Sequence, residues 1–205
     1  MSIYENTKVS KVSDCRTIRL LVLSTSENDG LRGTLEVASL ISPLSYYALS
    51  YVWGPFADPA RCIKCSSADR KLCADLPITT NCHDALTQIR RSYNRKWPSG
   101  SSIRIWIDAI CINQNDDAEK AEQIPLMEEI YGKANQVLIW LGKGCTSSDT
   151  AMDWIAQASL GQTPLLQGAR WKPFPRNMAP SEAWKLVNAA PSMLRRGQRM
   201  QYAVS

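Results

Sequence analysis

Residues 103–110, with the sequence IRIWIDAI, decide the expected fold class. Successive side chains of a β-strand point to opposite faces, so Ile103, Ile105 and Ile107 share one face. The other face carries Trp106 between two charged side chains. A strand with one solvent-exposed face rarely places tryptophan there. We therefore expect this strand to be covered on both faces, as strands of α/β folds are.

Strands are also predicted before and after this one. Residues 46–53 (YYALSYVW) are aromatic and β-prone, and residues 136–141 (QVLIWL) form the short apolar run typical of a central strand. Helical patterns begin at Asn81 and Asp116, which are both good N-cap residues. The alternation of strands and helices over residues 46–158 predicts crossover connections and a mostly parallel sheet.

Three further segments have strand patterns. Residues 17–23 (TIRLLVL) and 35–40 are predicted strands, and residues 61–74 are predicted to form a hairpin with its turn at 66–69. The expected fold is a three-layer α/β sheet, mostly parallel, with helices on both faces and the hairpin as a small insertion.

Charge and hydropathy exclude several classes of protein. No run of 18 apolar residues exists among the 205, so a spanning helix is not expected. The first 14 residues lack the basic-then-apolar pattern of a signal peptide, which favours the cytoplasm. The net charge of +5 comes from the end of the chain, because 17 basic and 18 acidic residues precede residue 170. We therefore expect neither nucleic acid nor a membrane as a partner.

The cysteines invite comparison with a zinc site. Cys62 and Cys65 have ligand-like spacing, but Cys73 and Cys82 do not form a second pair of that spacing, and the chain has a single histidine, His83. Seven cysteines without a secretion signal favour reduced thiols over disulfides. We expect no metal site.

Three segments resemble the fungal heterokaryon incompatibility (HET) domain family in order and spacing. They are residues 47–54 (YALSYVWG), residues 106–114 (WIDAICINQ) and residues 119–142, the last of which ends in WLG. Together with Arg19 and the helix near residue 81, the resemblance covers roughly residues 17–158. It implies a fold similar to Toll-receptor-type (TIR) domains, which is flavodoxin-like, and a role in the death of fused fungal cells after non-self recognition.

The expected domain organisation follows from the same resemblance. Residues 1–16 form a polar lead, residues 17–160 the HET domain, and residues 161–205 a basic extension. Full members of the family continue into an Arg/Trp-rich block that is not recognisable here. We interpret the extension as the truncated remainder of the domain.

Polar residues lie at the end of the strand predicted at 103–110 and in the loop after it. Asp108 lies at the end of its strand, where open α/β sheets bind ligands, and Asn113 and Gln114 follow in the loop. With Glu119 these side chains would hold a nucleotide ribose or water. Alternatively they satisfy backbone donors in a tight turn, with Glu119 completing a capping box.

Trp53 and Gly54 end another predicted strand, and together they form a second candidate for ligand binding. Gly54 would permit a close backbone approach, and Trp53 would either stack on a ring or close the edge of the sheet.

Three functions remain open. The first is a death effector that acts through self-association or other death-pathway proteins. The second follows from the TIR resemblance: an NAD hydrolase, with NAD as substrate and no resident cofactor, in which Glu119 or Asp108 stabilises the ribosyl cation. The third is an inactive, truncated paralogue.

Overall fold

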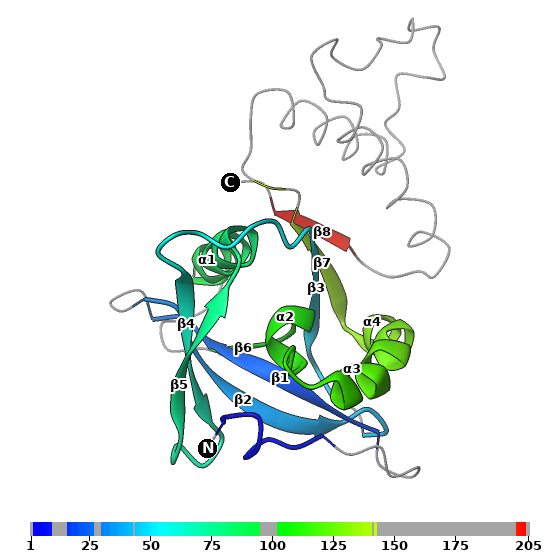
Figure 1. Cartoon of the computed structure of the whole chain (residues 1–205). Helices are drawn as coiled ribbons and strands as arrows, with labels where there is room; N and C mark the ends of the chain where they lie inside the picture. Colours follow the sequence, from blue (N-terminus) through cyan, green and yellow to red (C-terminus); the bar gives the residue numbers. More distant parts are fainter. Residues whose placement is uncertain are drawn as a thin grey trace, which may run out of the picture. The chain divides into compact units, whose positions relative to one another are not determined.

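Eight strands of the protein form one sheet, in the order β5-β4-β2-β1-β6-β3-β7-β8 (Figure 1). The computed structural model describes residues 2–9, 16–26, 30–42, 44–94, 102–140, 142 and 200–203; residues 143–158 of the predicted strand–helix alternation lie outside them. The strands are β1 (Thr17–Ser24), β2 (Arg32–Ser39), β3 (Tyr47–Tyr51), β4 (Arg61–Ser67), β5 (Cys73–Ile78), β6 (Ser102–Trp106), β7 (Gln136–Trp140) and β8 (Met200–Ala203). The helices are α1 (Thr80–Asn94), α2 (Asp108–Cys111), α3 (Asp117–Gln123), the 3₁₀ turn η1 (Ile124–Leu126) and α4 (Met127–Lys133).

The direction of the strands corrects the expected fold class. The neighbours β6, β3 and β7 are parallel, as the strand–helix alternation predicted, and their carboxyl ends lie at one edge. However, β1 lies at the centre of the sheet and pairs antiparallel with both β2 and β6. The sheet is therefore mixed, and the prediction of a mostly parallel, flavodoxin-like three-layer fold with helices on both faces is wrong.

The β4–β5 hairpin belongs to the main sheet. The two strands are antiparallel, as predicted, and the hydroxyl group of Ser67 binds Asp69 in the turn at 2.5 Å. However, β4 also pairs in parallel with β2 over Arg32–Leu35. The hairpin thus extends the sheet at one end and is not a separate insertion.

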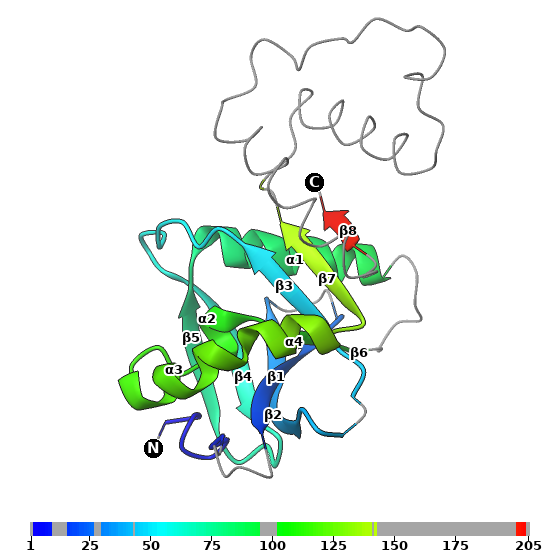
Figure 2. The same cartoon turned by 90° about the vertical axis from the view of Figure 1, so that its right-hand side faces the viewer.

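Three of the four α-helices in the described residues are shorter than crossover helices usually are; α1, with 15 residues, is the exception. α2 has four residues, and α3 and α4 have seven each. Figure 1 shows the sheet curling partly around α2, and Figure 2 shows α3 and α4 following one another along the chain. This arrangement replaces the expected helical layers.

The N-terminal cap of α1 differs from the prediction. The hydroxyl of Thr79 accepts a hydrogen bond from the backbone N–H of Cys82 at 3.3 Å, so the capping side chain is Thr79 and not Asn81. Asn81 instead donates from Nδ2 to the carbonyl of Val52 at 2.8 Å. This bond fixes the loop after β3 to the start of α1.

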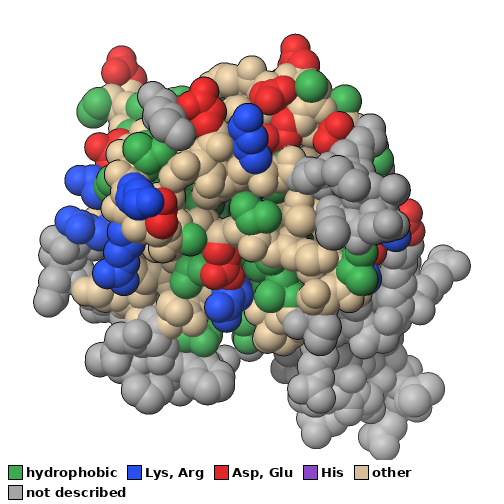
Figure 3. Space-filling view, turned by 90° about the horizontal axis from the view of Figure 1, so that it is seen from below, with side chains coloured by type: hydrophobic (Ala, Val, Ile, Leu, Met, Phe, Trp, Pro, Cys, Tyr) green, Lys and Arg blue, Asp and Glu red, His purple; other side chains and the backbone are tan. Residues whose placement is uncertain are grey.

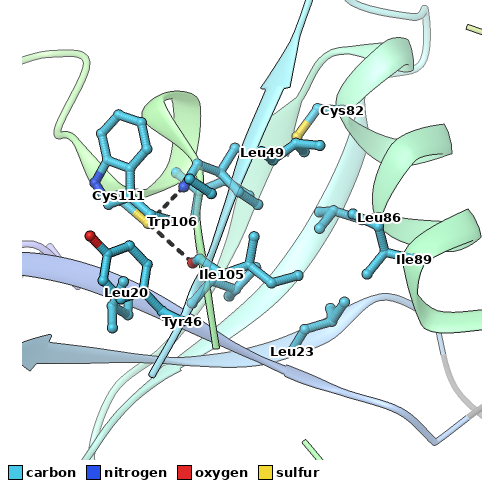
Figure 4. Close-up of a cluster of buried hydrophobic side chains, with 14 of the residues drawn as sticks. Leu20, Leu23, Tyr46, Leu49, Cys82, Leu86, Ile89, Ile105, Trp106 and Cys111 are labelled. Atoms are coloured by element: carbon cyan, nitrogen blue, oxygen red, sulfur yellow. Dashed lines mark hydrogen bonds between the residues drawn. The ribbon is translucent and has the colours of Figure 1, made fainter. Parts of the chain in front are cut away.

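The core is centred on β6. Ile105 and Trp106 point to opposite faces and are both fully buried, which confirms that this strand is covered on both sides. The indole of Trp106 packs edge-to-face on Tyr131 of α4, with ring centroids 5.5 Å apart. Figure 4 shows Leu86 and Ile89 of α1 in the same cluster of buried side chains as Ile105. These contacts join both helices to the centre of the sheet.

Among the residues that the structure describes, no helix has the length and apolar character needed to cross a membrane.

Candidate functional site

The loop after β3, residues 52–56, has a fixed conformation. Gly54 has a φ of +67°, and a Cβ atom there would lie 2.8 Å from Nδ2 of Asn81. The positive φ favours glycine, and any larger residue would have to displace the Asn81 side chain from its bond to Val52. The backbone N–H of Thr80 also donates to the carbonyl of Pro55 at 3.2 Å. Together with the bond from Asn81 to Val52, these contacts hold the loop against α1.

The structure brings Trp53 and Asp108 together. The indole Nε1–H of Trp53 donates to Oδ2 of Asp108 at 2.8 Å, and Oδ1 accepts from the backbone N–H of Ala109 at 2.7 Å. Asp108 was predicted to lie at the end of the strand. However, β6 ends at Trp106, and Asp108 is the first residue of α2. The parallel arrangement of β3 and β6 places the two side chains side by side.

Two tyrosines lie close to this pair. Burial raises the pKa of Tyr51, as do the charges of Cys82 and Asp108. Burial also raises the pKa of Tyr131, and the charge of Asp108 adds to the effect. We call Tyr51, Trp53, Asp108 and Tyr131 the strand-end cluster. The candidate residues from the sequence did not include the two tyrosines, although Tyr51 and Trp53 would share one face of the strand predicted over residues 46–53.

The carboxyl group of Asp108 is shifted toward its neutral form. Burial raises its pKa above the usual aspartate range, and the hydrogen bonds from Trp53 and Ala109 oppose this shift. A carboxyl group with a raised pKa in the folded state stabilises folding below its unfolded pKa. That contribution is lost as the pH rises through the folded value.

We therefore expect the stability of Asp108→Asn relative to the parent to be highest at pH 7 and to fall as the pH is lowered. The variant buries no charge at neutral pH, but its single amide oxygen can accept from Trp53 or from Ala109 and not from both. At low pH the parent gains stability, because its carboxyl group is then protonated in both the folded and the unfolded state. Urea unfolding of both proteins at a series of pH values measures this difference. A relative stability of the variant that rises as the pH falls would show that the carboxylate is held in its charged form.

Gln114 and Asn113 make local contacts with the backbone. Nε2 of Gln114 donates to the carbonyl of Asp108 at 2.9 Å, and Oδ1 of Asn113 accepts from the backbone N–H of Asn115 at 3.2 Å. Gln114 thus supports the backbone at Asp108. The contact of Asn113 with a backbone donor is of the kind that the structural alternative describes, whereas Gln114 donates to a backbone acceptor.

Glu119 lies away from the strand-end cluster and is paired with Arg19. Its Oε2 accepts from Nη2 of Arg19 at 2.8 Å, and Oε1 accepts from Nη1 of the same guanidinium and from the backbone N–H of Asn113. Asp116 caps α3 by accepting from the N–H of Glu119 at 3.0 Å, as predicted. The carboxylate of Glu119, however, does not return to Asp116, so the capping box is only half formed.

These contacts bear on the NAD-hydrolase hypothesis. Both carboxylate oxygens of Glu119 are bound within the protein, and the sheet lacks the flavodoxin-like arrangement from which that hypothesis followed. Of the two candidate carboxylates, Glu119 and Asp108, Asp108 lies in the strand-end cluster.

Arg19 is a structural centre that the candidate residues did not include. Its side chain is completely buried in β1. In addition to its bonds to Glu119, Arg19 donates from Nε to the carbonyl of Thr7 at 2.6 Å and from Nη1 to the carbonyl of Cys111 at 3.2 Å. Its guanidinium carbon lies 4.9 Å from the centre of the Tyr4 ring. The signal in the sequence is a single arginine in an otherwise apolar strand, which predicts a buried ion pair.

The cysteines whose spacing invited comparison with a zinc site differ in exposure. Cys62 is exposed and Cys65 is buried, because residues three apart on a strand lie on opposite faces. Cys73 is exposed, and burial raises the pKa of the Cys82 thiol to about 12. Within the described ranges, no three His, Cys, Asp or Glu side chains gather in a metal-binding arrangement.

Comparison with known proteins identifies the family. The family model described as "Heterokaryon incompatibility protein (HET)" matches residues 46–197. The chain is also 37% identical over 146 residues to heterokaryon incompatibility protein 6, OR allele, of Neurospora crassa, a match that covers 68% of this chain and 21% of the relative. The chain thus spans about a fifth of the length of that relative. No solved structure matches. The matched region contains Trp53, Asp108 and Glu119, and the chain belongs to the heterokaryon incompatibility (HET) family.

Proposed function

We propose that this chain is an effector of heterokaryon incompatibility that triggers cell death by associating with further copies of itself or with other death-pathway proteins. Membership of the HET family carries the incompatibility role. The conformation of the loop after β3 supports the binding role, because that loop presents apolar side chains to a partner.

This aromatic loop, residues 52–56, holds half of the large exposed hydrophobic side chains in the described part of the protein. Val52 is 54% exposed, Trp53 38% and Phe56 58%. Aromatic side chains dominate the binding energy of protein interfaces when they enter a partner's pocket. The bonds from Asn81, Thr80 and Trp53 hold this loop in place before binding, so little conformational entropy is lost on association.

The proposal is tested by inducing the chain in a fungal host and measuring growth and uptake of a vital dye. We expect induction to stop growth and to admit the dye. The variant with Val52→Ser and Phe56→Ser should accumulate as a folded protein with the circular dichroism spectrum of the parent, and it should allow growth.

A matched control changes two exposed apolar side chains of β2 and the turn after it. Val37 is 43% exposed and Ile41 56%. The variant with Val37→Ser and Ile41→Ser should stop growth as the parent does. Normal growth of cells that contain the folded parent chain would refute the effector role. Equal growth arrest by the parent and the loop variant would refute the role of the aromatic loop.

A further inference from the structure

The two edges of the sheet differ in how they are protected from pairing with another chain. β5 forms one edge, and its exposed residues include Asp75 and Pro77. A charged side chain and a proline, which has no N–H to donate, are usual protections of an edge strand. At the other edge, β8 covers β7, in which the four residues after Gln136 are apolar and buried. β7 contains neither a charge nor a proline, so its protection depends on β8.

β8 is a short strand that is joined to its partner by a long connection. Its four residues pair with β7 in parallel, from Met200 beside Val137 to Ala203 beside Trp140. Parallel pairing is slightly less stable per residue than antiparallel pairing. Residues 141–199 connect the two strands, and the effective concentration of a tethered strand near its partner falls as the connection lengthens. A β8 strand from a neighbouring copy therefore competes with the strand of the same chain.

Side chains on the face of the molecule in Figure 3 offer a weaker basis for association. Among the described residues on that face, hydrophobic side chains are interspersed with charged and polar groups. Single apolar side chains scattered in this way are usual on monomeric proteins and do not mark an interface. The backbone groups at the edge of β7, in contrast, form a ready template for a strand of a second molecule.

We propose that copies of this chain associate by exchanging β8, so that the β8 strand of one copy pairs with β7 of another. The occupant is a second copy because residues 200–203 are the segment that pairs with β7 in this fold. Exchange of an identical element uses the contacts of the monomer again and needs no new complementary surface. This inference rests on the self-association in the proposed function and assigns the element that carries it.

The exchanged strand lies near the aromatic loop. β3, β7 and β8 are parallel neighbours, and Tyr51, Trp140 and Ala203 are aligned across them. The aromatic loop begins at Val52, directly after Tyr51. The exchanged strand and the aromatic loop therefore lie at the carboxyl ends of the same strands, and both can contact one second copy.

The test identifies which chain supplies the strand beside β7 in the full-length protein. Leu138 and Gln201 are register partners on β7 and β8, and neighbouring strands lie close enough for a disulfide between such positions. The variant with Leu138→Cys and Gln201→Cys is prepared in a light form and in a form labelled with heavy nitrogen. The two forms are mixed as monomers, concentrated, oxidised with diamide and separated by size under native conditions. Mass spectrometry then shows which chains the new disulfide joins.

In the associated fraction we expect about half of these disulfides to join a light chain to a heavy one. In the monomer fraction, every such disulfide should lie within one chain. An associated fraction in which the disulfides lie only within single chains would overturn the exchange of β8 and leave the proposed self-association intact. A parent chain that stays monomeric at every concentration would overturn both.

A proline variant keeps the inference testable if the cysteine variant does not fold. Gln201→Pro with Tyr202→Pro removes two backbone N–H groups at the centre of β8, so this strand cannot pair normally with β7 of any copy. By sedimentation velocity we expect this variant to associate at least about tenfold more weakly than the parent. The matched control, Val204→Pro with Ser205→Pro, changes residues after β8 and should associate as the parent does. Equal association of all three proteins would refute the exchange.

Discussion

Replacing Arg19 by methionine is expected to lower the free energy of unfolding by about 3–5 kcal/mol, because the carboxylate of Glu119 would remain largely buried without its partner. The carbonyl groups of Thr7 and Cys111 would lose their donor at the same time. Guanidinium unfolding followed by tryptophan fluorescence measures the change. A loss of this size would account for much of the stability of a domain.

Two further variants separate the buried ion pair from a general loss of charge. Arg16 is 51% exposed in its ion pair with Glu129, so Arg16→Ala should cost less than about 1 kcal/mol. The double variant with Arg19→Met and Glu119→Leu should recover part of the stability lost by Arg19→Met, since it leaves no uncompensated charge. If Arg19→Met and Arg16→Ala had equal effects, the ion pair of Arg19 would not be the structural centre described above.

A fragment that begins at residue 46, where the family match begins, is expected not to fold cooperatively. The fragment lacks β1 and β2. β1 lies between β2 and β6 and contributes the fully buried side chains of Leu20, Leu21 and Leu23. Within the sheet, β4 pairs with β5 on one side and with β2 on the other. Loss of β1 and β2 would therefore separate the β4–β5 hairpin from β6, β3 and β7.

The fragment and the full chain can be compared by thermal unfolding monitored by circular dichroism. We expect a cooperative transition for the full chain and a broad or absent one for the fragment. A fragment with a transition as sharp as that of the full chain, near the same temperature, would show that β1 and β2 are accessory to the domain.

Local patterns in the sequence predicted individual elements well. β7 follows from the continuous apolar run at 136–140, and the hairpin follows from two strands joined by a polar turn at Asp69. These predictions hold because hydrophobic periodicity and turn chemistry depend on neighbouring residues. The direction of a strand within a sheet, in contrast, does not depend on neighbouring residues in the sequence. The apolar pattern of β1 is the same whether the strand runs parallel or antiparallel to β6, and the fold class was wrong for this reason.

Part of the candidate site could be predicted by the same reasoning. The strand–helix alternation predicted parallel strands, and β3 and β6 are parallel neighbours whose ends bring Trp53 and Asp108 together. The partner of Glu119 was not predicted, because Arg19 lies 100 residues away in the sequence. Thr79 was missed as a cap because Asn81, two residues later, ranks above threonine as an N-cap by residue type.

The central position of β1 has a consequence during synthesis. β1 pairs on one side with β2, which follows it directly, and on the other with β6, which is made about 80 residues later. Ribosomes add roughly 5–20 residues per second, so several seconds pass before β6 emerges. Throughout that interval the nascent chain displays an open, apolar strand edge, the kind that pairs with other chains. Chaperone demand should therefore be highest while the first hundred residues are outside the ribosome, and it should fall once β6 closes that edge.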